Sequence, residues 1–199
     1  AVLDEQFGSF DMGADSFGAF DFAVDYNVPT GQKSALRINF HSDTLENHRD
    51  YYDGDRYGFN PTLRLEISPV TTLDLSYEHA DHERFIDRGV PTLNGEPVED
   101  FEDIVFGDTD TNLQTLRADI YRANLSHEFS ETRKGNLVVQ YSDFQKLYKN
   151  YYASGYSGGD TFTADGYLDP TERNNLILSG NIVNEFQTGS AKHTLLVGA

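Results

Sequence analysis

Aromatic residues and one arginine in polar stretches of the chain have the clearest potential for chemistry. Tyrosine rings can stack on a flat ligand and donate hydrogen bonds from their hydroxyl groups, and an arginine can pair with an anionic group through two parallel hydrogen bonds. The candidate ligand-binding residues are Tyr51, Tyr52, Phe85, Arg88, Tyr151, Tyr152 and Tyr156. Arg88 is the strongest candidate, because its guanidinium would attract an anionic ligand.

Other motifs lack the pattern that their chemistry would need. His79–Glu83 supplies two histidines and two acids, but histidine zinc motifs need a fixed spacing, such as that of a helix, which is absent here. Ser157–Asp160 is glycine-rich, but it precedes no helix and has no lysine for a phosphate. The acids of Glu96–Asp110 lack the positions of a calcium loop. With no cysteine and no Ser/His/Asp arrangement either, we expect no catalysis, no metal site and no resident cofactor.

The charge of the chain limits its partners. The formal net charge is -18, from 33 acidic residues against 15 lysines and arginines. Nucleic acid and anionic membrane surfaces would be repelled by such a surface, so both are poor partners. A cationic or metal-bearing ligand would be attracted. Simple solubility explains the same charge, and both interpretations stay open.

Strict alternation of apolar and polar residues predicts that β-strands position the candidate residues. The alternating segments are 20–28, 36–41, 57–67, 73–78, 121–129, 137–142 and 176–186. Within them every Asp, Glu, Lys and Arg falls on one face. No stretch approaches the roughly 18–20 apolar residues that a membrane helix needs. We predict an all-β protein with one apolar face, on which Phe22, Leu65, Leu125 and Leu178 lie together.

The connections favour an up-and-down β-barrel over a soluble β-sandwich. Short turns are predicted at Pro29–Gln32, Pro69–Thr71, Glu131–Gly135 and Thr188–Ser190, and long polar stretches at about 42–55, 80–115 and 143–173. Short and long connections alternate, which is typical of outer-membrane barrels with short periplasmic turns and long outer loops. Tyr26, Phe129 and Phe186 precede short turns, as the rings of an interfacial girdle do.

The readable strands do not make a complete barrel. About nine strands can be counted, whereas bacterial single-chain barrels close with an even number, and the last strand, at 192–199, stops without a turn. An open sheet edge cannot be left in lipid, where no water satisfies the backbone. We therefore expect this chain to be part of a larger transmembrane β-barrel.

Several motifs resemble those of TonB-dependent siderophore receptors. Asp87–Pro91 reads Asp-Arg-Gly-Val-Pro and is similar to a signature of the early barrel of that family. Asn60–Leu65 resembles the family's Pro-Ser-Leu strand, and Lys192–Gly198 its His-Thr-Leu-Leu-Val-Gly strand. Gly8–Phe10 and His48–Tyr51 fit the same order. The resemblance covers nearly the whole chain.

This resemblance implies a 22-stranded barrel in the bacterial outer membrane, filled by an N-terminal plug. Residues 1–199 would be the N-terminal part of the barrel domain, with the plug domain and TonB box absent from them. The implied function is uptake of a ferric siderophore, which is a transported ligand and not a cofactor. The implied partners are that siderophore, outer-membrane lipid and, through the plug region, the TonB–ExbB–ExbD complex. Arg88 and the pair Tyr151–Tyr152 would then face the outer vestibule.

Alternatives remain at this point. The chain could belong to an outer-membrane porin or adhesin barrel, or to a secreted acidic β-sandwich that binds carbohydrate or calcium. The tyrosines could pack on one another or form the outer aromatic girdle. Arg88 could pair with a neighbouring carboxylate, given the local excess of acids.

Overall fold

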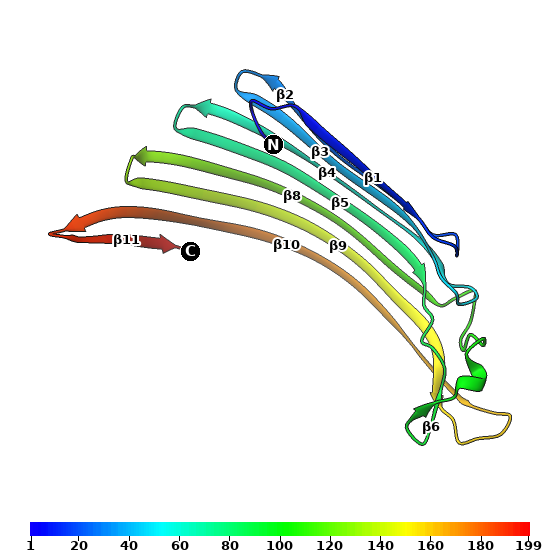
Figure 1. Cartoon of the computed structure of the whole chain (residues 1–199). Coiled ribbons are helices and arrows are strands. Elements are labelled where there is room, and N and C mark those ends of the chain that lie inside the picture. The colour runs from blue at the N-terminus through cyan, green and yellow to red at the C-terminus, as the bar shows by residue number, and fades with distance from the viewer.

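The computed structural model describes all residues from 1 to 199 and consists almost entirely of one antiparallel sheet (Figure 1). Its nine strands are β1 (Phe7–Ala14), β2 (Phe20–Gly31), β3 (Ser34–Glu46), β4 (Asp53–Ser68), β5 (Thr71–Phe85), β8 (Leu113–Ser130), β9 (Arg133–Gly155), β10 (Thr163–Thr188) and β11 (Ala191–Gly198). Each strand pairs with the next one along the sheet in sequence order. The predicted all-β, consecutively hairpinned fold is confirmed.

The segment between β5 and β8 carries the remaining elements. They are a hairpin of β6 (Thr92–Leu93) and β7 (Glu96–Pro97) and a 3-10 turn, η1 (Glu99–Phe101). The structure contains no helix that is long and apolar enough to cross a membrane.

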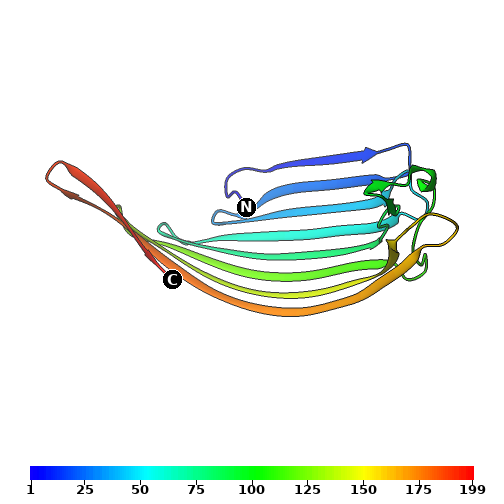
Figure 2. The ribbon, with the colours of Figure 1, turned by 90° about the horizontal axis from the view of Figure 1, so that it is seen from below.

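The sheet is curved and has no second layer (Figure 2). A β-sandwich would pack two sheets face to face around a shared core, but here the only other sheet is the short β6–β7 hairpin. The buried apolar residues are few, namely Ala35, Phe85, Ile86, Phe106 and Ala118. The sandwich alternative therefore fails for this chain.

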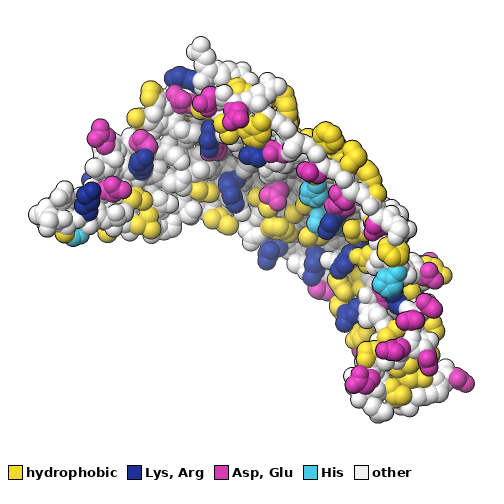
Figure 3. Space-filling model, in the orientation of Figure 1, with side chains coloured by type: hydrophobic (Ala, Val, Ile, Leu, Met, Phe, Trp, Pro, Cys, Tyr) yellow, Lys and Arg dark blue, Asp and Glu magenta, His cyan; other side chains and the backbone are white.

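Strand register places the predicted apolar residues on one face. Leu178 pairs with Val139, and the same row continues through Ala123 and Leu75 to Leu63. Because side chains alternate along a strand, Phe22, Leu65, Leu125 and Leu178 share this face, as predicted. Figure 3 shows apolar side chains along the outer margin of the arch and lysines and arginines across its hollow side.

The apolar convex face is open to its surroundings. Leu176 is 74% exposed and Leu178 is 69% exposed. A contiguous apolar surface of this kind marks contact with lipid or with another protein. The concave face instead carries cross-strand ion pairs, such as Arg37–Asp25 and Arg64–Asp74.

The two ends of the sheet differ as the sequence predicted. The turns at 32–33, 69–70, 131–132 and 189–190 gather at one end, on the left in Figure 1. The connections at 15–19, 47–52, 86–112 and 156–162 lie at the other end. Short and long connections thus occupy opposite rims of the sheet.

The predicted loops were too long, because the strands continue into them. β9 has 23 residues and β10 has 26, so 143–155 and 163–173 are strand and not loop. At about 3.3 Å per residue, β10 is roughly 85 Å long, whereas an apolar membrane band is about 25 Å tall. Beyond Tyr141 the convex positions of β9 are no longer uniformly apolar, because they include Asp143, Gln145 and Lys149. The alternation therefore ends there, although backbone pairing does not.

Candidate functional site

Three tyrosines gather on the concave face near the rim of the long loops. Tyr148 and Tyr152 share this face of β9, and Tyr167 reaches them from β10. The rings of Tyr148 and Tyr167 stack with centroids 5.5 Å apart and an interplanar angle of 7°, and Tyr152 lies edge-on to Tyr167 at 6.5 Å. We call these three residues the tyrosine cluster.

Arg88 covers the tyrosine cluster from the loop between β5 and β8. Its Nη1 donates a hydrogen bond to the Tyr167 hydroxyl oxygen at 3.0 Å, and its Cζ lies 4.9 Å from the centroid of the Tyr152 ring. Arg88 forms no ion pair with any carboxylate of the chain. An exposed guanidinium without a carboxylate partner can accept an anionic ligand, while the rings below offer stacking surfaces.

A second group of polar side chains continues from the tyrosine cluster across the concave face. Register pairs Tyr148 with Gln114 and Gln114 with Arg84, and the Arg84 Nε donates to the Gln114 Oε1 at 2.9 Å. An adjoining cavity of about 250 Å³ is lined by Tyr52 together with Arg84 and Gln114. Arg56, His82 and Glu83 line the same cavity. Arg56 is paired with Asp43 at 2.7 Å, so acidic groups balance part of the basic charge there.

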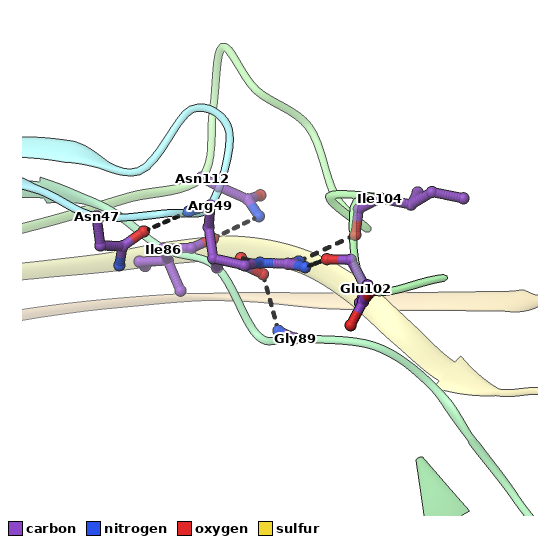
Figure 4. A network of polar contacts seen from close by, with 8 residues as sticks. Asn47, Arg49, Ile86, Gly89, Glu102, Ile104 and Asn112 are labelled. Atoms are coloured by element: carbon purple, nitrogen blue, oxygen red, sulfur yellow. Dashed lines mark hydrogen bonds and ion pairs between the residues drawn. The ribbon is translucent and has the colours of Figure 1, made fainter. Parts of the chain in front are cut away.

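Arg49 fastens the long loop that carries Arg88 (Figure 4). Its Nε donates to Asp87 Oδ2 at 2.6 Å, and its Nη2 donates to the backbone oxygen of Ile104 at 3.0 Å. Nη1 donates to the backbone oxygen of Glu102. The side chains of Arg49 and Asp87 are only 14% and 8% exposed. The hydrogen bond to Asp87 raises the pKa of Arg49, so the guanidinium stays charged. We call this the Arg49 clamp.

Asn112 ties the end of the same loop to β9. Its Nδ2 donates to the backbone oxygens of Ile86 and Tyr151 at 3.0 and 2.9 Å, and its Oδ1 accepts from the Tyr151 N–H at 2.8 Å. Asn112 is 2% exposed. The clamp and Asn112 together hold residues 86–88 in place, and with them the backbone of Arg88.

An apolar cluster joins the outer ends of the two longest connections. Phe106 lies edge-on to Phe162 with ring centroids 5.0 Å apart, and Phe101 lies edge-on to Tyr156 at 5.4 Å. The Tyr156 hydroxyl donates to the Gly159 backbone oxygen at 3.0 Å. Tyr156 thus packs within this loop–loop contact, away from Arg88.

The other predicted site residues are dispersed. Phe85 is the last residue of β5 and is only 6% exposed. Tyr151 lies on the convex face of β9, opposite to its neighbour Tyr152, and Tyr51 is an exposed turn residue with φ of 64°. Of the seven candidates, Arg88 and Tyr152 meet in one cluster and Tyr52 lines the adjoining cavity.

Two members of the cluster were not among those candidates. Tyr148 and Tyr167 both fall in the stretch 143–173, which the sequence predicts to be a loop. Their spacing carries a signal, since Tyr148 and Tyr152 differ by four residues and so share a face of a strand. That signal becomes readable only once β9 is known to extend to Gly155.

Comparison with known proteins gives consistent matches in sequence and structure. The chain is 26% identical over 208 residues to the metal-pseudopaline receptor CntO of Pseudomonas aeruginosa, in strains PAO1 and UCBPP-PA14. The match covers 98% of this chain and 28% of the relative, so the chain spans under a third of the curated relatives' length. A comparison with models of protein families finds no match.

The structural matches cover almost the whole chain. The ferric-catecholate import receptor Fiu from Escherichia coli K12 matches with a TM-score of 0.79 and 18% identity, over 97% of this chain and 30% of that one. The siderophore receptor PiuA from Acinetobacter baumannii matches with 0.80 and 18%, over 100% and 30%. The outer-membrane ferripyoverdine receptor of P. aeruginosa gives 0.82 and 17%, over 98% and 27%. The fold is therefore a segment of the barrel of such receptors, which confirms the resemblance seen in the sequence.

Proposed function

We propose that this chain is the N-terminal part of the barrel domain of a TonB-dependent receptor that takes up a ferric siderophore or a related metal chelate. The observation that carries the proposal is Arg88, which has no carboxylate partner and lies over the tyrosine cluster on the concave face. The partial-barrel fold and the similarity to receptors for metal chelates support it. Transport, and coupling to the TonB–ExbB–ExbD complex through a plug, belong to the whole receptor.

The location follows from the two faces of the sheet. The convex face carries exposed leucines and valines near the short turns and polar residues beyond Tyr141. An apolar band that ends in aromatic rings matches the lipid-facing surface of an outer-membrane barrel. Tyr77, Tyr121 and Tyr141 form a row of rings at the upper end of this band. We infer that the long loops lie outside the cell and the short turns in the periplasm.

The chemistry of the site favours a bulky anionic ligand that carries flat groups. The Arg88 guanidinium can donate paired hydrogen bonds to an anionic oxygen, and the tyrosine rings can stack on an aromatic or conjugated part. The formal charge of -18 makes such a local basic site unusual in this chain. A ferric siderophore has these properties and is the transported ligand here, so no resident cofactor is needed and no catalytic role is assigned.

Cysteine labelling of intact cells tests the topology. We expect a cysteine at Gly95, in the loop between β5 and β8, to react with a membrane-impermeant maleimide in the full-length protein. A cysteine at Gly189, in the turn between β10 and β11, should react only after the outer membrane is opened. The chain has no native cysteine, so the background is clean. Labelling at 189 but not at 95 on intact cells would overturn the topology.

Replacing Arg88 tests the site. We expect Arg88→Ala in the full-length receptor to weaken siderophore binding by about 1–3 kcal/mol, because a charge-assisted hydrogen bond to the ligand is lost. Thermal stability should not change, since the side chain is exposed and makes no ion pair. Titration with ferripyoverdine, a ferric catecholate and metal-pseudopaline gives the affinities.

Arg122→Ala is the matched control for this experiment. Arg122 lies on the same face, nearer the short turns, and donates only to the Gln140 Oε1, at 2.9 and 2.6 Å. Its loss should leave affinity unchanged. Equal affinity of Arg88→Ala and the parent receptor would assign Arg88 to the scaffold.

A further inference from the structure

Asn150 of β9 is a buried side chain whose polar atoms are all unpaired. It is 1% exposed, and neither its Nδ2 nor its Oδ1 has a hydrogen-bond partner. The other buried asparagines differ. Asn27 donates to the backbone oxygens of Val2 and Glu5 at 2.9 and 2.6 Å, and Asn112 uses both ends of its amide. A buried amide without partners is costly, so this position calls for an explanation.

The neighbours of Asn150 are those of the candidate site. Alternation along β9 places its side chain on the concave face between Tyr148 and Tyr152, and register sets it directly opposite Tyr167. The three rings therefore surround the amide, and Arg88 lies above them, bonded to Tyr167 and stacked over Tyr152. Asn150 is thus flanked by the same tyrosines that Arg88 contacts.

The Arg88 side chain makes only weak interactions with the rest of the chain. Arg88 interacts with the hydroxyl groups of Tyr167 and Tyr148 and with the face of the Tyr152 ring, and no carboxylate holds it. Its backbone, in contrast, is fixed by the neighbouring Arg49 clamp. The side chain can therefore turn toward a ligand without movement of the loop.

We propose that Arg88 is a gate over Asn150, and that Asn150 recognises an amide group of the incoming ligand. An asparagine side chain offers a donor and an acceptor side by side. The N–H and C=O of one residue in an extended peptide segment of the ligand present the complementary pair, as Tyr151 does to Asn112. Arg88 turns from the Tyr167 hydroxyl to an anionic oxygen of the same ligand, which uncovers the buried amide. The ligand class is an amide-bearing anionic chelate. This inference rests on the proposed function and adds which class of ligand the receptor would select.

Cysteine accessibility tests the gate without any ligand. In the full-length protein, Asn150→Cys should react slowly with a small methanethiosulfonate reagent, and at least about tenfold faster when combined with Arg88→Ala. Ser142→Cys is the matched control, because Ser142 is also 1% exposed on the concave face of β9 but lies away from Arg88. Its reaction should not respond to Arg88→Ala. Equal reaction of Asn150→Cys with and without Arg88 would overturn the gate.

Binding tests the recognition of the amide. Asn150→Leu should bind ferripyoverdine, a chelate with a peptide chain, about tenfold more weakly than the parent receptor does. Its melting temperature should be equal or higher, since an unpaired buried amide is removed. If this variant does not fold, Asn150→Ala serves the same purpose. Ser142→Ala should bind like the parent.

The two proposals fail in different ways. If the parent receptor binds a probe and Asn150→Leu binds it equally well, the inference about Asn150 is wrong and the receptor function stands. If the parent binds none of the amide-bearing and catecholate probes, the proposed function is wrong and the inference falls with it.

Discussion

Leu178→Arg in the full-length protein should lower the free energy of unfolding from a lipid bilayer by about 2–4 kcal/mol. Leu178 is 69% exposed on the convex face and lies in a row of apolar side chains that includes Val139 and Leu75. If this face contacts hydrocarbon, a guanidinium there loses its hydration without gaining a partner. Denaturant unfolding in liposomes, followed by the mobility shift of folded barrels on gels, measures the effect.

Ile177→Arg is the control for that measurement. Ile177 is the next residue of β10, is 47% exposed and lies on the concave face opposite Gln140. A charge on this polar face should change stability by about 1 kcal/mol or less. An equal or larger loss with Ile177→Arg would show that the assignment of the two faces to lipid and lumen is reversed.

Arg49→Ala should release the loop between β5 and β8. Its removal leaves Asp87, whose side chain is 8% exposed, with the Gly89 N–H as its only remaining partner. Because the pair is only partly buried, we expect its loss from one side to cost about 1–3 kcal/mol. The backbone oxygens of Glu102 and Ile104 also lose their donor. We expect this loss in the local stability of residues 86–104, measured as faster hydrogen exchange of their amides.

Two control variants show whether the effect of Arg49→Ala comes from the loss of this ion pair. The double variant with Arg49→Met and Asp87→Leu should be less damaging than Arg49→Ala, because no unpaired charge remains. Arg56→Ala breaks the more exposed pair with Asp43, in which the Arg56 side chain is 48% exposed, and should cost about 1 kcal/mol or less. Unchanged exchange of residues 86–104 in Arg49→Ala would show that the clamp does not hold the loop.

The Arg49 clamp also clarifies the motif at 87–91. The resemblance drew attention to Arg88 as a binding residue, while the structure gives its neighbour Asp87 a structural role. Two consecutive residues of one loop thus have different roles. Asp87 binds Arg49 and holds the loop, and Arg88 contacts the tyrosine cluster. The competing role considered for Arg88, a bond to a nearby carboxylate, belongs instead to Arg49.

The sequence by itself determined the sheet, its faces and its two rims. These features follow from local rules, since an alternation of period two assigns faces and turn residues mark the ends of strands. The predicted turns at Pro69–Thr71 and Thr188–Ser190 agree with the strand ends, and that at Pro29–Gln32 shifts to 32–33. The alternation of apolar and polar residues could not predict the outer part of β9. Between Tyr141 and Gly155 both faces of this strand carry polar residues, so its sequence resembles that of a loop.

Only the tertiary structure decided which candidate residues meet. Arg88 and Tyr167 are 79 residues apart and touch because β9 and β10 extend beyond the apolar band to the level of the loop. Tyr151 and Tyr152 are adjacent in sequence but lie on opposite faces, so one joins the site and the other does not. Asn150 is buried without a partner, and its register neighbour Tyr167 comes from another strand, β10. Such a property is a sum of long-range contacts, and no local pattern of residue types specifies it.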